Sequence, residues 1–450
     1  MRVILTPFYG GEMREGDMAT TQLRSDSGGI AQRRSGLVLN RISQAILALG
    51  GLLVLYSLFR AAVGNPDVFF QQVLNGLQLG FIYALIALGY TMIYGIVKLI
   101  NFAHGDVFMV GAFTSFFAIS MADLHRWPAQ VWPGMNGTVV TMVGAGTVIL
   151  LSMFIAGILA VVMERFAYRP LRNKPRIAAL ITAIGVSFFL EYFAALPFAY
   201  TNNYITYPRP FDFSVLSADT VSPVVIWAAW GLFVLSLAVY GVFAWLGRRG
   251  NQQAQVWRRS PFLQLGMLLG GFLAVVLTLV GAAPTVGGEE WDLTVSNIMV
   301  VIMVSSILLQ VVLQYIVLNT RLGKAMRASA YDKPTSRLMG INVDWVIAAT
   351  FALGGALAGA GGVLYATAFK QVHHLMGIIP GLKAFVAAVI GGIGSIPGAL
   401  VGALIMGQTE VLSAGFISTP MRDAIAFSML IVVLLIRPQG IFGEPPAEKV

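Results

Sequence analysis

The chain has 450 residues, of which 57% are hydrophobic and 11% are charged, and its mean hydropathy is +0.78. A soluble domain could not bury so much apolar surface, so the composition indicates a membrane protein. The absence of cysteine excludes disulfides, thiolate chemistry and cysteine-ligated metals. A net charge of +9 would suggest nucleic-acid binding in a soluble protein. Here the basic residues lie between apolar runs, where they orient a membrane chain, so no nucleic-acid partner is expected.

The N-terminal residues 1–41 are polar and contain glycine and serine, which predicts a disordered extension. The first apolar run, 42–62, is long enough to cross a bilayer and follows a long leader, so it is interpreted as an anchor and not a cleaved signal. Met13 and Met18 are equally good candidates for the initiating methionine.

Apolar runs of span length recur along the rest of the chain, each close to the roughly 20 residues that a membrane helix needs. Helices are expected because hydrocarbon cannot satisfy the backbone groups of an open strand. The sequence therefore predicts an all-α polytopic membrane protein with about 10–12 transmembrane helices. After 42–62 the runs lie near 71–97, 105–122, 138–163, 177–198, 223–246, 262–285, 294–318, 345–369, a broken region at 381–412, and 422–436.

Basic residues concentrate in alternate loops, which predicts that these loops and both chain termini are cytoplasmic. The loops between them carry several acids and few bases. The bases of the three predicted cytoplasmic loops are Arg165, Arg169, Arg172, Lys174 and Arg176, then Arg248, Arg249, Arg258 and Arg259, then Arg321, Lys324, Arg327, Lys333 and Arg337.

The apolar region 381–412 contains the stretch GGIGSIPGAL, whose glycines and proline should break a helix. Two shorter helical pieces with a turn near Ser395 would return the C-terminus to the cytoplasm. Broken helices of this kind often line substrate pathways, but a plain helix–loop–helix hairpin is an equal alternative.

Small residues recur at four-residue spacing, which lets helix backbones approach closely in lipid. They are Gly76, Gly80 and Ala84, then Gly354, Ala358 and Gly362, then Gly398 and Gly402.

Polar residues inside apolar runs are costly and tend to face an interior or a cavity. Such residues are Asn75, Gln78, Tyr83, Tyr90 and Tyr94 in the second run, Glu191 in the fifth, and Gln408 and Glu410 after the glycine break. The stretch NFAHGD, Asn101 to Asp106, is expected at the cytoplasmic end of the second run. His104 beside Asp106 falls short of a metal-ligand set, and a helix cap or local pair is the more ordinary interpretation, so no metal site is predicted.

Several catalytic motifs are absent from the sequence. There is no G-x-x-x-x-G-K-[ST] phosphate loop, no H-E-x-x-H and no G-x-S-x-G. The chain is therefore expected to bind no ATP in the usual way and to have no catalytic residues, and a membrane enzyme is disfavoured.

The strip RASAYDKPTSRLMGIN, Arg327 to Asn342, is the polar exception between two apolar runs. Asp332 can cap a helix by accepting the amide of Thr335, Pro334 suits the first turn, and Gly340 can end it. This predicts about two turns from Lys333 to Met339, roughly 10 Å long. Thr335, Leu338 and Met339 would share one side. Such a helix fits either a groove in a partner protein or the lipid headgroups.

The strip resembles the cytoplasmic coupling loop of ABC importer permeases, whose signature of Glu-Ala-Ala, three residues and Gly docks into an ATPase. Pro334, Thr335 and Ser336 stand in the Glu-Ala-Ala positions and Gly340 in the glycine position. Further stretches, in the expected order, resemble branched-chain amino acid permeases of the LivH type. They are NGLQLGFIYALIALGYTMIYGIVKLINFAHGD, ERFAYRPLR, LITAIGVSFFLE, GKAMRASAYDKPTSRLMGINVDWVIAATFALGGALAGAGGVLY, GLKAFVAAVIGGIGSIPGALVGALIMG and LLIRPQGIFG.

The resemblance implies a permease core in two parts, 69–220 and 293–450, with a coupling loop at 319–344. Residues 42–68 would be an additional transmembrane helix and loop, and 221–292 an inserted transmembrane hairpin. The implied protein is one permease subunit of a bacterial inner-membrane importer. Its partners would be a second homologous permease, two cytoplasmic ATPases that bind ATP and Mg²⁺, a periplasmic substrate-binding protein and membrane lipid. Coupling would rest on Asp332, Pro334, Thr335, Ser336, Leu338, Met339 and Gly340.

The substrate is left open among leucine, isoleucine and valine, other amino acids, urea and short amides. A self-sufficient secondary transporter or channel is the alternative class, and it would need a paired buried acid and base. Glu191 and Glu410 have no obvious basic partner within their own spans. Pathway candidates are Asn75, Gln78, Asn101, His104, Gly391, Gly392, Gly394 and Gly398.

Overall fold

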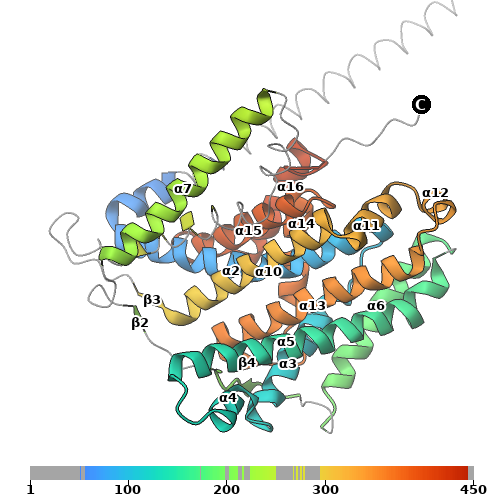
Figure 1. The fold of residues 1–450 in the computed structure, drawn as a ribbon, viewed down its shortest axis with the longest axis horizontal. Helices are drawn as coiled ribbons and strands as arrows, with labels where there is room; N and C mark the ends of the chain where they lie inside the picture. The colour runs from blue at the N-terminus through green and yellow to red at the C-terminus, as the bar shows by residue number, and fades with distance from the viewer. Residues whose placement is uncertain are drawn as a thin grey trace, which may run out of the picture. The chain divides into compact units, whose positions relative to one another are not determined.

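The computed structural model describes residues 51, 56–172, 174–197, 202–210, 215–216, 223–249 and 294–443, with isolated helical positions between 267 and 278 (Figure 1). Residues 1–63 form one unit and residues 64–450 another, and the helical bundle belongs to the second unit. The predicted extension 1–41 lies outside the described residues. Residues 56–62 of the predicted first span are helical.

Seven described helices are long and apolar enough to cross a membrane, and the bent pair His104–Ser120 and Leu124–Val131 would make an eighth. This confirms the predicted all-α polytopic class. The number is below the expected 10–12 because α14 and α16 are short and the runs at 42–62 and 262–285 are only partly described. The main helices are α2 (Pro66–Val97), α3 (His104–Ser120), α5 (Gly137–Met163), α6 (Arg176–Ala194), α7 (Pro223–Arg248), α10 (Asn297–Asn319), α13 (Val343–Phe369), α14 (Ile378–Gly391), α15 (Ile396–Phe416) and α16 (Arg422–Ile436).

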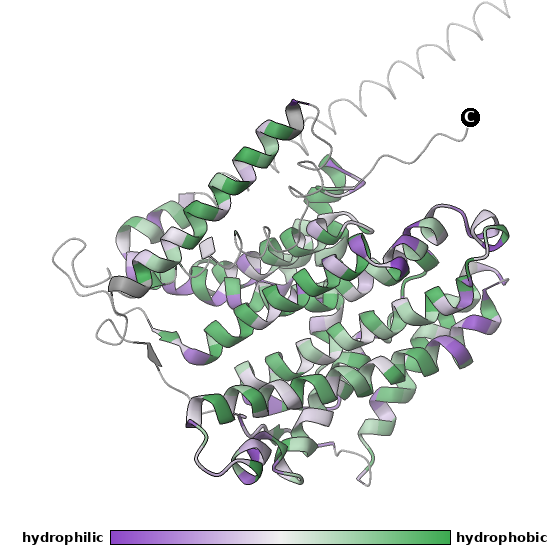
Figure 2. Cartoon of the chain, viewed as in Figure 1, coloured by the Kyte–Doolittle hydropathy of each residue, from purple (hydrophilic) through white to green (hydrophobic). Residues whose placement is uncertain are grey.

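Short elements connect these helices. They are a 3-10 turn at Leu124–Arg126, α4 (Trp127–Val131), a π-helical turn at Glu164–Tyr168, a 3-10 turn at Arg169–Leu171, α11 (Arg321–Tyr331), α12 (Lys333–Leu338), β1 (Ile205–Thr206), β2 (Val215–Leu216), β3 (Val295–Ser296) and β4 (Gln371–Val372). Because α13 follows α12 and precedes β4, its two ends define an α12 end and a β4 end of the bundle (Figure 1). Polar residues gather at the α12 end (Figure 2).

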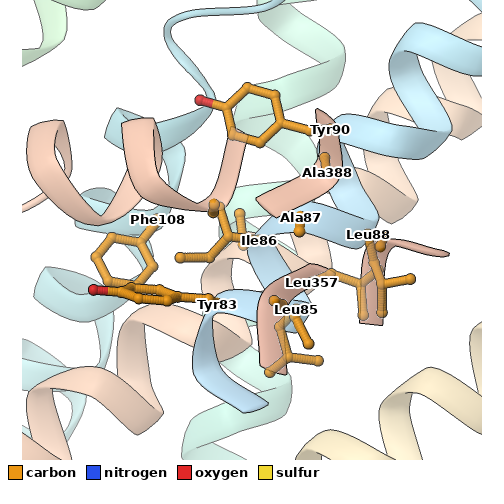
Figure 3. Packing of buried hydrophobic residues seen from close by; sticks show 14 of the residues in the cluster. Tyr83, Leu85, Ile86, Ala87, Leu88, Tyr90, Phe108, Leu357 and Ala388 are labelled. Carbon is orange, nitrogen blue, oxygen red and sulfur yellow. The ribbon is translucent and has the colours of Figure 1, made fainter. Parts of the chain in front are cut away.

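Helix α2 forms the centre of the core. Every residue from Leu79 to Ile93 is buried, so this stretch is apolar on all sides, as expected for a helix surrounded by protein. Its side chains meet Phe108 of α3, Leu357 of α13 and Ala388 of α14 (Figure 3).

The small residues predicted to allow close packing lie at helix contacts. A Cβ on Gly80 of α2 would be 2.9 Å from the Leu404 Cα of α15, and one on Gly407 of α15 would be 2.5 Å from the Gly80 nitrogen. On α13, a Cβ on Gly354 would be 3.2 Å from Ile93. At the crossing of Gly80 with Gly407 only hydrogen fits, and at Gly354 the Ile93 side chain would have to move to admit a Cβ, which confirms the packing prediction.

Two antiparallel strand pairs join distant parts of the chain: β1 with β4, and β2 with β3. The second pair brings residues 215–216 beside 295–296, so the chain leaves and re-enters the core at one place. Between them α7 contacts the helical positions near 278, where Trp230 Nε1 donates to Thr278 Oγ1 at 2.8 Å.

Candidate functional site: a coupling helix and a charged cavity

The strip singled out in the sequence folds into α11 and α12, separated by one residue. The Asp332 amide donates to the Ala328 carbonyl at 3.1 Å, which closes α11. The Asp332 carboxylate accepts the Thr335 amide at 3.2 Å and the Thr335 hydroxyl at 2.5 Å, which opens α12. Pro334 lies in the first turn, and Gly340 follows the helix with a φ of +82°. The predicted short helix is confirmed, although it ends at Leu338.

The outer face of α12 is apolar and open. Leu338 is 87% exposed and Met339 is 78% exposed, and Thr335 is exposed beside them. Ser336 differs from its predicted role at a docking surface: it is buried, and its hydroxyl donates to the Asp332 carbonyl at 2.6 Å. It therefore stabilises the first turn of α12.

Asp344, at the start of α13, joins α12 to the loop between α5 and α6. Its carboxylate pairs with Arg172 at 2.5 Å, with Arg169 at 2.7 Å and with Arg337 of α12 at 3.6 Å. Arg172 also pairs with Glu164. The sequence indicated only that these arginines orient the loop. It contained no sign that Asp344 gathers Arg169 and Arg172, because these two lie 175 and 172 positions before it in the chain.

Asn75 and Gln78 of α2 line a cavity of about 800 Å³ near the β4 end, among α2, α14, α15 and α16. They also line a cavity of about 190 Å³ with Thr294. The larger cavity contains Lys383, Glu410 and Asp423.

Lys383, only 1% exposed, holds two carboxylates: Glu410 at 2.6 Å and Asp423 at 2.7 Å. Tyr83 donates to Glu410 at 2.9 Å. Glu410, which was noted as having no obvious basic partner within its own span, therefore has one on another helix. Lys383 lies on the other piece of the broken region 381–412, and only the folding of α14 against α15 brings the two charges together.

Glu191 has no ion pair within the part of the chain that the structure describes. Ser187 donates to Asp106 at 2.5 Å and to Glu191 at 3.3 Å, so one hydroxyl links two carboxyl groups. Asp106 and Glu191 both line a cavity of about 260 Å³ between α3, α6 and α14.

The stretch NFAHGD was expected at the end of the second span, and this is wrong. His104 starts α3 beside Gly89, eight residues before α2 ends at Val97, which is about 12 Å along the helix. The His104 ring lies 4.6 Å from the Tyr90 ring, and buried Asn101 accepts the Tyr168 hydroxyl at 2.6 Å. The chain thus turns back into the bundle, where non-helical backbone is tolerated because protein surrounds it.

The glycine break is confirmed. Gly392 and Gly394 have φ of +102° and +105°, and Ser395 caps α15 by accepting the Gly398 amide at 3.2 Å. With 14 residues, α14 is about 21 Å long, less than the roughly 30 Å of a bilayer core. The C-terminal segment after α16 satisfies carbonyl groups at the C-terminal end of α14. The Ile441 and Phe442 amides donate to the carbonyls of residues 390 and 391 at 2.9 Å each.

The residues predicted for the pathway do not share one cavity. Asn75 and Gln78 lie at the β4 end, whereas Gly394 lines a cavity of about 510 Å³ near α11 at the other end of α2. Asn101 and His104 are buried. Gly391, Gly392 and Gly398 pack against backbone. Among the residues described, no three histidine or acidic side chains form a group that could hold a metal ion.

Comparison with known proteins places these features in a family. Residues 72–434 match the family model described as branched-chain amino acid transport system / permease component. The chain is 35% identical over 382 residues to the permease protein LivH of a high-affinity branched-chain amino acid transport system in Salmonella typhimurium, covering 85% of this chain and 98% of that relative.

The LivH protein of Escherichia coli K12 is 35% identical over 385 residues, again covering 85% of this chain and 98% of the relative. The BraD permease protein of Pseudomonas aeruginosa is 33% identical over 387 residues, covering 86% and 100%. No solved structure matches the chain. With a match that spans its core helices, the polar strip and the glycine break, the chain belongs to the family of branched-chain amino acid transport system permease components.

Proposed function

We propose that the chain is one permease subunit of a bacterial inner-membrane ABC importer that carries branched-chain amino acids. A second homologous permease, two cytoplasmic ATPases and a periplasmic binding protein would complete the importer, with ATP and Mg²⁺ on the ATPases. The single observation that supports this most is α12, a capped helix with an open apolar face in a family of transport-system permeases.

In this proposal α12 inserts Leu338 and Met339 into a groove of an ATPase. Exposed apolar anchors of this kind fit helix-in-groove recognition. The arginines around Asp344 would pass a displacement of α12 to α13 and to the loop between α5 and α6. Helix α13 packs on α2, α3 and α5, so its displacement would reach the centre of the bundle. Basic loops at the α12 end support a cytoplasmic position for this surface.

The test is to replace both Leu338 and Met339 by Asp in the assembled complex. Charges cannot be desolvated in an apolar groove without a partner, so we expect the ATPases to be lost on copurification and ATP-dependent leucine uptake to fall. Met121→Asp is the matched control, because Met121 is a comparably exposed methionine that follows α3 and lies outside α12. Retained ATPases with normal uptake in the double variant would refute the coupling role.

The substrate is tested by delivering different solutes on their binding protein. We expect leucine, isoleucine or valine to stimulate ATP hydrolysis by the complex. Stimulation only by urea, a short amide or another class of amino acid would reassign the importer while leaving its mechanism intact.

A self-sufficient secondary transporter is the second candidate, favoured by one observation: Lys383 and Glu410 are the buried pair of opposite charge that ion coupling would need. Vesicles containing this chain alone discriminate the two. Leucine uptake driven by an ion gradient without ATP would support the transporter.

A further inference from the structure

We propose that the cavity of about 800 Å³ around Lys383 is a transit site for a zwitterionic amino acid, in which Lys383 receives the carboxylate and Glu410 with Asp423 receives the ammonium group. The inference rests on the proposed function and names the substrate class of that same pathway.

The cost of the charges is the first argument. Lys383 comes from α14, Glu410 from α15 and Asp423 from the start of α16, so three helices bring ionised groups to one point. Packing alone is served equally well or better by apolar side chains of similar volume. Charged residues in membrane proteins face interiors or cavities and mark substrate pathways. This cluster forms part of a cavity wall, so a role beyond packing is the better explanation.

Charge balance is the second argument. The cavity contains two bases, Lys383 and Arg422, and two acids, Glu410 and Asp423. Lys383 contacts both carboxylates, at 2.6 and 2.7 Å, and Asp423 also pairs with Arg422 at 3.4 Å. A ligand carboxylate can replace one protein carboxylate at Lys383, and the displaced carboxylate can then pair with the ligand ammonium group. The exchange leaves no charge unpaired, and a net-neutral ligand keeps the site net neutral.

The remaining walls fit an aliphatic amino acid. Leu79 and Ile82 of α2 and Val411 of α15 form apolar surface next to the charges, while Asn75 and Gln78 add amide groups. The volume falls within the roughly 300–1,000 Å³ of small-molecule sites. Urea and neutral amides carry no charged groups that could exchange with the ion pairs of Lys383, so the cavity favours amino acids over them. Tyr83 orients Glu410 through its hydroxyl and is a positioning residue.

The experiment uses the complete importer in proteoliposomes, with radiolabelled L-leucine delivered by the binding protein. Lys383→Met alone leaves the buried Glu410 carboxylate without its cation, while Asp423 keeps Arg422, and the variant can misfold. The informative variant is therefore Lys383→Met with Glu410→Gln, which removes both charges of the pair and leaves Asp423 with Arg422. We expect this variant to copurify with the ATPases and to unfold at a similar temperature. Its leucine uptake should fall about tenfold or more, as for the loss of a charge-assisted contact.

Lys383→Arg keeps the cation and is expected to retain uptake with a changed half-saturating concentration. Trp230→Phe is the control and should transport normally. It removes a hydrogen bond made by α7, and Trp230 does not line this cavity. Wild-type uptake by the Lys383→Met, Glu410→Gln variant would overturn the proposal, because a purely structural pair can be replaced as a unit. Failure of the proposed function is distinguishable, since the unmodified chain would then show no ATPase association and no ATP-dependent uptake.

Discussion

At the residue scale, Asp332 has two structural roles because it stands between two helices. Its main-chain amide completes α11, and its side chain begins α12. Two hydrogen bonds hold the pKa of Asp332 below its usual range. The larger effect comes from the Thr335 hydroxyl and the smaller from the Thr335 amide. The direction of the shift means that the ionised form is the one the folded helix stabilises. The cap is therefore complete at neutral pH and is lost as the pH falls through the lowered pKa.

Replacing Asp332 tests this role. Asp332→Asn should leave α12 and ATPase binding nearly unchanged, because asparagine caps helices as well as aspartate does. Asp332→Ala removes the acceptor and should weaken copurification of the ATPases and reduce leucine uptake in part. Equal loss in both variants would show that the negative charge matters and not the cap; no loss in either would show that α12 does not need its cap.

At the element scale, the helices approach one another so closely that several crossings admit only glycine. Gly407 of α15 illustrates this: an added Cβ would lie 2.5 Å from the Gly80 nitrogen and 2.6 Å from the Gly76 carbonyl oxygen. These contacts are to main-chain atoms, which cannot rotate away as a side chain can. The α2–α15 pair must therefore separate if Gly407 gains a methyl group.

Gly407→Ala is expected to destabilise the purified protein by about 1–3 kcal/mol, the usual range for overpacking. The control is Gly146→Ala, also inside a helix, because nothing lies within 4 Å of its added Cβ. That control should be neutral or up to about 1 kcal/mol more stable, since alanine favours helix over glycine. Thermal unfolding in detergent measures both, and equal stabilities would contradict the described α2–α15 crossing.

At the scale of the whole molecule, the chain carries a segment that leaves the core at β2 and returns at β3. Leu216 pairs with Val295, and Val215 pairs with Ser296. These strands hold the two ends of the segment together without the helices between them. The permease core is therefore expected to be independent of α7 and of the helical positions near 267–278.

Excision of residues 217–294, with Leu216 joined to Val295 through Asn-Gly, tests this independence. The two-residue turn suits an antiparallel pair, so the core should fold, bind the ATPases and transport leucine. A longer excision that also removes 295–299 should fail, because it deletes β3 and Ser296, which caps α10 by accepting the Met299 amide at 3.1 Å. Loss of assembly in the shorter deletion would show that the segment is part of the core or of its partner interface.

The features that sequence reasoning predicted correctly depend on neighbouring residues. The α12 cap needs Asp332, Pro334 and Thr335 in one short stretch, and the break before α15 needs its glycines and Ser395. Helix lengths could be predicted from runs of apolar residues, since a bilayer requires a minimum length. Small residues at a spacing of four predicted close crossings, although their partners could not be named.

The amino-acid sequence by itself determined that this is a helical membrane protein, where most of its helices begin and end, and that a short polar helix interrupts them. Only the tertiary structure decided that Lys383 meets Glu410 and that Asp344 gathers arginines from another loop. It alone also placed His104 deep beside Gly89. The physical reason is the range of the interactions: caps, breaks and apolar runs act within a few residues, whereas ion pairs and depth arise when distant helices pack.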